Sequence, residues 1–428
     1  MLDMKFIREE KDLVKKDLEK RQEKDKLLLL KNLLKKDEEW RKLKKEVDEL
    51  RHRRNQISQQ INKLKKEGKK AEKELKEAKA IPKKIIDTES KTDLLRKEMH
   101  DIQMRLPNIM HESVPYGKDD TENKVVRTWG KIKKPAFELK PHGELMEELG
   151  VAEFDRAAKI SGKGFYYLLG DLVLLDQALL QFAISKLVKK GYTPVQPPYM
   201  MRTEAYEGVI DLADFETMMY KIQDQDLHLI ATSEHPMGAI FMNEVLEPKK
   251  LPIKLGGISP CFRKEIGSHG VDEKGIFRVH QFNKIEMFIF CKPEDSWKHH
   301  EELIANAEEI FQELELPYRI VNICTGDLGI VAAKKYDLEL WMPREEKYKE
   351  AVSCSNCTAY QATRLNIRYR TGEGNKFVHT LNSTLVTDTR PLRAIFEHHQ
   401  NKDGSVNIPK ALHPYMYGKK KITLQRKW

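Results

Sequence analysis

The chain has 428 residues, of which 40% are apolar and 34% are charged, and its formal net charge is +10. This length and apolar fraction suffice for one large core with an appendage, or for two domains. No apolar run approaches a membrane span or the core of a signal peptide, and the five irregularly spaced cysteines indicate free thiols. The composition therefore excludes a membrane protein and a disulfide scaffold, and predicts a soluble, cytoplasmic protein.

The positive charge is concentrated in the N-terminal quarter of the chain. Residues 1–112 hold 33 Lys and Arg against 24 Asp and Glu, whereas the remaining 316 residues hold 44 against 43. The net charge of the first part is therefore +9 and that of the second is +1. Such an imbalance is expected where one part of a protein meets a polyanion.

A heptad seam begins after one or two short helices that are predicted in residues 3–34. From Trp40 onward the apolar residues step by three and four, and only Arg54 fills an apolar position of the seam. Gly68 and its flanking lysines then interrupt the pattern. The spacing predicts a long helix that packs against a partner helix and ends close to Gly68.

A second helical stretch follows the glycine and is expected to end before Pro107. Pro82 lies inside this stretch, where it should kink the helix or mark a restart. The simplest arrangement is an antiparallel two-helix coiled coil over about residues 35–106 that turns near Gly68. This hairpin is assigned to an N-terminal domain of residues 1–110.

Basic side chains gather near the predicted tip of the hairpin, where few acidic residues accompany them. They are Arg51, Arg53, Arg54, Lys63, Lys65, Lys66, Lys69 and Lys70, followed by Lys73, Lys76 and Lys79. Phosphate backbones attract such a surface without base readout, and double-stranded RNA is recognised largely by shape and phosphates. The alternative is a dimerisation or spacer element whose lysine-rich face is solvated.

The second part of the chain, residues 111–428, starts with a proline-rich linker and shows a mixed α/β pattern from about residue 145. Leu168–Lys190 predicts an amphipathic helix that leads into a short strand and Pro198. Leu227–Glu234 predicts a strand that runs into a polar tripeptide. A helix is expected from Met237 to Leu246.

Two polar segments have an ordinary structural explanation beside a functional one. Thr232-Ser233-Glu234 suits a helix N-cap with an acid in the first turn at least as well as a binding site. Cys354 and Cys357 have the spacing of a zinc pair, but no second pair or His pair accompanies them, so we predict no zinc. Glu350 and Ser353 are better candidates, as oxygen ligands for Mg²⁺ beside phosphates.

Residues 261–290 predict a strand, a charged loop and a second strand. The loop contains Gly267, Gly270 and Gly275, which supply turn geometry. One face of the second strand is expected to carry Arg278, His280, Phe282, Lys284 and Glu286, because side chains alternate with period two. A nucleotide site would use such a face, with Arg263 at a phosphate, Phe282 under a base and Glu286 at a cationic group. A polar, solvent-facing sheet surface is the alternative.

This stretch resembles motif 2 of class II aminoacyl-tRNA synthetases. The resemblance rests on Phe262-Arg263-Lys264-Glu265 and on Phe277 to Phe282 of the returning strand. It is most similar to seryl-tRNA synthetases of the archaeal and eukaryotic branch. The helix, strand and Pro198 at about residues 170–199 resemble motif 1. The strand and helix at about residues 380–400, in which Arg390 matches the motif arginine, resemble motif 3.

The resemblance implies an α+β fold, with an N-terminal antiparallel coiled-coil arm followed by a catalytic domain built on an antiparallel β-sheet flanked by helices. It also implies an enzyme that activates L-serine with ATP and Mg²⁺ and transfers serine to the 3′ end of tRNA(Ser). A second candidate tRNA substrate is tRNA(Sec). A homodimer is implied as well, because motif 1 forms the dimer interface in that family.

The resemblance assigns roles to residues of both domains. The catalytic group is Arg263, Glu350 and Arg390. The serine-binding group is Thr232, Ser233, Glu234, Arg263, Glu286, Asn382 and Thr384. The ATP-binding group is Arg263, Lys264, Glu265, Val279, His280, Gln281, Phe282, Glu350, Ala351, Val352, Ser353 and Arg390. The tRNA-binding group is Arg51, Arg53, Arg54, Lys63, Lys65, Lys66, Lys69 and Lys70, and the Mg²⁺ ligands are Glu350 and Ser353.

The chain departs from the family pattern at a few positions. Pro343-Arg344-Glu345-Glu346 replaces a turn that contains glycine, and Ala359 and Thr363 stand where Asp and Arg are usual. Two other classes of function are also considered. A non-charging paralogue could keep the fold and bind RNA or a protein, and an armless ligase could load a carrier protein, although the long basic hairpin argues against the second.

Overall fold

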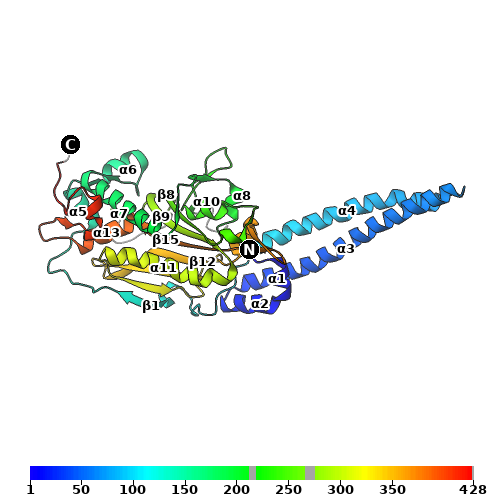
Figure 1. Ribbon diagram of the computed structural model, residues 1–428, viewed down its shortest axis with the longest axis horizontal. Helices are drawn as coiled ribbons and strands as arrows, with labels where there is room; N and C mark the ends of the chain where they lie inside the picture. The colour runs from blue at the N-terminus through cyan, green and yellow to red at the C-terminus, as the bar shows by residue number, and fades with distance from the viewer. Residues whose placement is uncertain (212–217, 266–274, 427–428) are drawn as a thin grey trace. The chain divides into compact units, whose positions relative to one another are not determined.

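The computed structural model describes residues 1–211, 218–265 and 275–426 (Figure 1). They divide into two compact units, Met1–Pro107 and Asn108–Trp428. The predicted turn residues Gly267 and Gly270 lie outside the described residues. In the part of the chain that is described, no helix is long and apolar enough to cross a membrane.

The first unit consists of helices. They are α1 (Met4–Glu9), α2 (Lys11–Lys20), α3 (Lys24–Lys66) and α4 (Glu72–Gln103). Figure 1 shows α3 and α4 lying side by side as a long hairpin. Helix α3 begins earlier than the predicted start near residue 35, and α4 continues across Pro82, so the helix does not restart there.

An apolar seam holds α3 and α4 together. Its far part is formed by Leu50, Ile57, Ile61, Leu64, Ala71, Ala78, Ile81 and Ile85. Between the helices, Gly68 has a φ of +67°, a left-handed conformation that favours glycine. Arg54 was expected in the seam but is exposed, because a guanidinium without a partner is costly to bury.

The second unit is built on a sheet of eight strands among the described residues, in the order β1-β10-β11-β12-β15-β9-β8-β4. Their bounds are β1 Lys124–Trp129, β10 Tyr318–Asn322, β11 Lys334–Met342, β12 Lys347–Asn356, β15 His379–Thr387, β9 Gln281–Cys291, β8 Ile253–Phe262 and β4 Thr193–Val195. Neighbouring strands are antiparallel except for β4 and β8, which are parallel.

Helices cover both faces of this sheet. Helices α7 (Gly170–Lys189), α11 (Ser296–Glu313) and α13 (Thr389–His398) contribute to one core, as Figure 1 shows for α11 lying along the strands. Helices α8 (Thr203–Glu207), α10 (Glu234–Ala239) and α12 (Tyr360–Leu365) contribute to a second core. The polar site described below lies beside this second core.

The side chains of β9 divide between these layers. Ile285, Met287 and Ile289 enter the core with α7 and α11, whereas Phe288 and Phe290 enter the other. Phe282, Lys284 and Glu286 share the parity of Phe288, as predicted. The strand begins only at Gln281, so Arg278 and His280 precede it and are not part of the strand face.

The remaining elements are short and lie around the sheet. The helices are α5 (His142–Glu148) and α6 (Asp155–Ser161), and the strands are β2 (Ala152–Glu153), β3 (Tyr167–Leu168), β5 (Met200–Met201), β6 (His228–Leu229), β7 (Val245–Leu246), β13 (Arg368–Thr371), β14 (Gly374–Phe377), β16 (Val406–Asn407) and β17 (Lys421–Ile422). The helix predicted to reach Leu246 ends at Ala239. Asn243, with a φ of +63°, turns the chain so that β7 pairs with β13 instead.

A pair of buried carboxyl groups joins α7 to the start of α13. The Asp176 and Asp388 carboxyl groups influence each other's pKa, and one oxygen of each finds no hydrogen-bond partner among the described residues. The second Asp388 oxygen accepts the backbone N–H of Asn283 at 2.7 Å. Burial raises the pKa of both carboxyl groups, and the charge of Asp176 adds to the rise at Asp388. The two groups therefore share a proton.

The shared proton makes a prediction about stability. An unfolded chain releases both aspartate protons near pH 4, whereas the folded protein retains one well above it. The free energy of unfolding should therefore fall by about 2 kcal/mol as the pH rises from 5 to 8. Asp176→Asn supplies a permanent N–H donor, so its urea denaturation should lose most of this pH dependence. Asp155→Asn, at an exposed position, should keep it, and an equal slope in wild type and Asp176→Asn would contradict the shared proton.

Candidate active site

Two adjoining cavities lie over β9, β12 and β15, and they share Arg263, Lys284, Glu350 and Thr384 in their walls. The first also contains Phe277, Phe282 and Arg390, and the second Thr232, Glu234, Glu286 and Asn382. All of these residues except Phe277 and Lys284 were predicted site residues. Side chains from segments more than one hundred residues apart thus meet in one place.

Two β-bulges set the direction of four side chains that line the cavities. Glu350 and Ser353 are three residues apart, so in a regular strand they would point to opposite faces. The pairing of β12 with β11 shifts between Leu338 and Glu339, which leaves Ala351 as an extra residue and turns the Glu350 and Ser353 side chains toward the second cavity.

The pairing of β15 with β9 shifts in the same way. Thr384 lies opposite Glu286 and Val386 lies opposite Ile285, which leaves Leu385 as the extra residue. Thr384 and Thr387 therefore both line the first cavity. Sequence alternation alone could not have placed Thr387 there.

The first cavity brings cations and aromatic rings together. The guanidinium of Arg263 lies 5.2 Å from the ring centroid of Phe282, and its Nε donates to the carbonyl of Ala231 at 3.4 Å. The guanidinium of Arg390 lies 5.5 Å from the ring centroid of Phe277. Cations beside flat rings suit a ligand that combines phosphates with a base.

Glu350 lies beside Arg390 in the same cavity. Its carboxylate is 3.7 Å from the Arg390 guanidinium, which also donates to the Glu350 carbonyl. Enclosure favours the neutral acid, but the charges of Arg390 and Lys335 outweigh it and lower the Glu350 pKa. An ionised carboxylate and the Ser353 hydroxyl form an oxygen donor set that fits Mg²⁺.

The second cavity is built around a buried ion pair. The Lys284 ammonium lies 2.6 Å from the Glu286 carboxylate and donates to the Thr232 hydroxyl at 3.0 Å. Burial raises the pKa of Glu286, and burial with the nearby Glu286 charge raises the pKa of Glu234. Two carboxyl groups share one ammonium partner here, so the cavity suits a ligand with a further positive charge.

Five predicted site residues are not among those that line the two cavities. Ser233 and Val352 are fully buried, and Val352 packs in the hydrophobic core because it directly follows the β12 bulge. Gln281 is exposed because its parity is opposite to that of Phe282. Lys264 is the fourth, and its backbone N–H donates to the carbonyl of Met218.

His280 is the fifth of these residues, and it supports the site from outside. Its Nδ1 lies 2.9 Å from both the Tyr220 hydroxyl and the Arg263 carbonyl, and its ring stacks on Phe165. It therefore holds the backbone at Arg263 in place, and it lines neither cavity. The sequence could not distinguish these roles, because His280 lies just before the strand.

Sequence reasoning missed several cavity residues. Lys284 has the parity of Phe282 and Glu286, so alternation placed it correctly, but it received no role. Lys335 of β11 lines the second cavity and lies opposite Ser355 of β12. Its ammonium group pairs with the Asp337 carboxylate at 3.2 Å. Phe277, Thr387 and Thr389 complete the first cavity, and no sequence signal identified Lys335 or Thr389.

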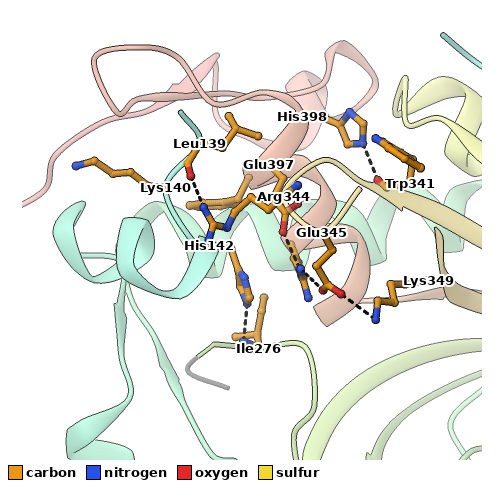
Figure 2. A network of polar contacts seen from close by, with 12 residues as sticks. Leu139, Lys140, His142, Ile276, Trp341, Arg344, Glu345, Lys349, Glu397 and His398 are labelled. Carbon is orange, nitrogen blue, oxygen red and sulfur yellow. Dashed lines mark hydrogen bonds and ion pairs between the residues drawn. The ribbon is translucent and has the colours of Figure 1, made fainter. Parts of the chain in front are cut away.

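A buried ionic network supports Phe277 from behind. The guanidinium of Arg393 lies 4.6 Å from the Phe277 ring centroid, and it donates to Glu397 at 2.7 Å and to Glu345 at 2.6 Å. Figure 2 shows Glu345 also facing Lys349, at 2.9 Å. The turn that departs from the family pattern thus supplies Glu345 as the partner of a fully buried arginine.

The same network fixes the backbone next to Phe277. The Nε2 atom of His142 accepts the backbone N–H of Ile276 at 3.2 Å, as Figure 2 shows. Burial and the charges of Arg393 and Arg344 lower the His142 pKa to about 3, so the ring is neutral and can accept. Neither of the other two departures, Ala359 and Thr363, lines the two cavities.

The cations of the helical hairpin fall into two groups. Arg51 pairs with Glu89 at 2.6 Å and Arg53 with Glu77 at 2.8 Å, both across the hairpin, so the expected lack of acidic neighbours does not hold for them. Two lysines near the turn, Lys69 and Lys70, also have acidic partners. Arg54, Lys63, Lys65 and Lys66 are exposed and have no ion pair among the described residues.

Comparisons with known proteins cover both units. A family model described as the seryl-tRNA synthetase N-terminal domain matches residues 1–110. A model described as the class II tRNA synthetase core domain (G, H, P, S and T) matches residues 217–399. A curated serine–tRNA ligase of Methanocella arvoryzae is 58% identical over 421 residues, which are 98% of this chain and 99% of that protein.

Solved structures agree with these matches. The seryl-tRNA synthetase of Pyrococcus horikoshii complexed with ATP has a TM-score of 0.95 and 49% identity, with 100% of both chains covered. The cytoplasmic serine–tRNA ligase of Naegleria fowleri in complex with AMP has a TM-score of 0.91 and 34% identity, covering 100% of this chain and 99% of that one.

The support behind Phe277 yields a prediction. Glu345→Gln removes a charge partner from Arg393, whose side chain is 0% exposed. Arg393 keeps Glu397 as its second partner, but the loss of one charged partner leaves its buried charge only partly compensated, so the free energy of unfolding should fall by about 2 kcal/mol. Glu346→Gln, an exposed position in the same turn, should change it by less than about 0.5 kcal/mol. Urea denaturation measures both, and equal values would show that Glu345 does not stabilise the network.

Proposed function

The chain belongs to the seryl-tRNA synthetase family, and we propose that its catalytic unit activates L-serine with ATP and transfers the serine to tRNA through the residues of the two cavities. The family matches confirm the predicted family and the predicted α+β fold with its coiled-coil arm. The single observation that carries the residue assignment is that the two cavities are contiguous. One suits a nucleotide, and the other suits a small cationic group.

The first step forms seryl-adenylate. A serine carboxylate oxygen attacks the α-phosphorus of ATP, and pyrophosphate leaves as the bond between the α-phosphorus and the bridging oxygen breaks. Arg263, shared by both cavities, bridges the serine carboxylate and the α-phosphate and offsets the charge that builds up there. Arg390 contacts the distal phosphates, and Phe282 stacks on the adenine.

The second step transfers serine. The terminal ribose hydroxyl of tRNA attacks the carbonyl carbon of the adenylate, AMP leaves, and an ester joins serine to the tRNA. Neither step requires a nucleophile from the protein, so orientation of the reactants and charge neutralisation supply the catalysis. The shared wall between the cavities keeps the two reacting groups adjacent.

Glu350 and Ser353 are the residues that would hold Mg²⁺. The lowered pKa of Glu350 keeps its carboxylate ionised, and the β12 bulge turns both side chains the same way. When bound, Mg²⁺ supplies positive charge to the phosphate oxygens. Glu350 in addition orients the Arg390 guanidinium through its own ion pair.

The second cavity sets the choice of amino acid. Glu286, Glu234 and Thr232 bind the ammonium and hydroxyl groups of serine, and Asn382 with Thr384 closes the pocket. A pocket that hydrogen-bonds a hydroxyl rejects alanine strongly, because alanine leaves buried polar groups unpaired.

The partners follow from both units. The exposed cations near the hairpin turn contact the phosphate backbone of tRNA(Ser), within an N-terminal domain of residues 1–110. The catalytic domain of residues 111–428 is expected to form a homodimer through the region of α7. A cytoplasmic location is supported by the five cysteines, which are all free thiols.

Amino-acid-dependent ATP–pyrophosphate exchange tests the activation step. Exchange should occur with serine and not with alanine or threonine. Glu286→Gln should lower kcat/KM for serine at least about 30-fold, since removing a partner from a buried charge pair costs about 2 kcal/mol or more. Glu294→Gln, at an exposed position, is the control. No exchange by the wild type would favour a non-charging paralogue, and a wild-type rate in Glu286→Gln would remove Glu286 from the site.

The arm can be tested separately from activation. Replacing Lys63, Lys65 and Lys66 together by Gln should raise KM for tRNA about tenfold and flatten its salt dependence, because fewer counterions are released on binding. Pyrophosphate exchange should not change. The matched control replaces Lys42, Lys44 and Lys45 of the same helix, of which Lys42 and Lys45 already pair with glutamates. Equal effects of the two triple variants would contradict a tRNA contact at the tip.

A further inference from the structure

Helix α12 packs tightly against one wall of the second cavity. That wall is the segment of residues 207–211, in which Val209, Ile210 and Asp211 line the cavity. The Arg364 guanidinium donates to the carbonyls of Glu207 and Ile210. A Cβ atom at Gly208 would lie 2.2 Å from the Leu365 side chain, which would have to shift to admit it.

Gln361 is the polar centre of this contact, and its side chain is 0% exposed. Its Nε2 donates to the carbonyl of Val209 at 3.0 Å, and its Oε1 accepts from the Thr380 hydroxyl at 2.7 Å. Because a backbone carbonyl only accepts, the amide orientation is fixed. The neighbouring Gln361 amide also lowers the pKa of the Glu234 carboxyl group.

The charges around Glu234 explain why an amide is suitable at this position. The ionisable groups that face or adjoin Glu234 come from several elements, namely Glu286, Lys284, Arg263, Cys357, His235 and Tyr206. Burial keeps His235 neutral, and its ring contacts the Tyr206 hydroxyl. A further cation beside Glu234 would repel an incoming ammonium group, whereas an amide stabilises the carboxylate without adding charge.

We propose that Gln361 is a positioning residue for serine recognition, whose amide holds the Val209–Asp211 wall beside the Glu234 carboxylate, in the geometry that receives the serine ammonium group. Gln361 does not line the two cavities, so it acts through Glu234 and Val209. This role rests on the proposed function of the second cavity. It adds a residue from α12, which carries none of the three sequence motifs.

A hydrogen bond to the ionised form of a carboxyl group lowers its pKa, and Gln361 acts on Glu234 in that direction. Removing the amide therefore raises the pKa of Glu234 further. At a given pH more of the Glu234 side chain is then protonated, and it attracts the ammonium group less. The acidic limb of the serine kcat/KM profile should consequently move to higher pH.

The test is serine-dependent ATP–pyrophosphate exchange by the full-length chain, measured from pH 6 to 9. Gln361→Met keeps the side-chain length and removes the hydrogen bonds. It should raise KM for serine about tenfold, leave KM for ATP within about twofold, and move the acidic midpoint of serine kcat/KM to higher pH. Thr363→Val is the control on the same helix, because the Thr363 hydroxyl bonds only the Ala359 carbonyl among the contacts described.

A merely structural role gives a different result. KM values for serine and ATP would then rise together, or neither would change, and the pH midpoint would stay in place. Either result overturns the proposal.

If Gln361→Met does not fold, Gln361→Glu carries the test, since it keeps the volume and the acceptor for Thr380. Its expected result is a rise in the serine KM alone. Absence of serine-dependent exchange in the wild type would instead refute the function of the cavity itself.

Discussion

The buried ammonium of Lys284 is the constraint on which the catalytic unit depends. A single charge in the interior is costly unless a partner and hydrogen bonds compensate for it. Glu286 on the same strand and Thr232 before α10 provide that compensation. Burial and the nearby charge of Glu286 raise the pKa of Glu234, and the two carboxyl groups give the cavity a local excess of acid that a cationic substrate group can neutralise.

Strand irregularities convert this charged strand into a site. Regular alternation would send Glu350 to the core and leave only Ser353 facing the substrate, and it would separate Thr384 from Thr387 in the same manner. One extra residue in each of two neighbouring strands corrects both directions. The core side of the sheet is preserved, because Val352 and Val386 still enter it. Catalytic geometry and core packing are therefore reconciled within single strands.

Much of the fold could be predicted from the sequence, because heptads and strand alternation are properties of short segments. The hairpin, the parity of Phe282, Lys284 and Glu286, and the strand and helix around Arg390 all followed from such patterns. The supporting contacts of His280 could not be predicted, since they depend on where β9 begins. Lys335 and Gln361 were missed because their significance comes from contacts with segments far away in the chain.

The departures from the family pattern illustrate the same limit. The turn at residues 343–346 replaces a glycine-containing turn of the family pattern. Glu345 within it neutralises the buried Arg393. The Arg54 side chain looked like a flaw in the seam, yet it is exposed. In both cases the meaning of a residue was set by its three-dimensional neighbours and not by its position in a motif.

The arm has a further property that follows from its single apolar seam. In the far part of the hairpin, the seam joins each turn of α3 to the turn of α4 beside it. Removing or adding seven residues in both helices would preserve the seam and move the tip by about 10 Å along the hairpin axis. The arm can therefore act as a molecular ruler. Its length can change in steps of seven residues to suit RNAs of different size, while the catalytic sheet stays unchanged.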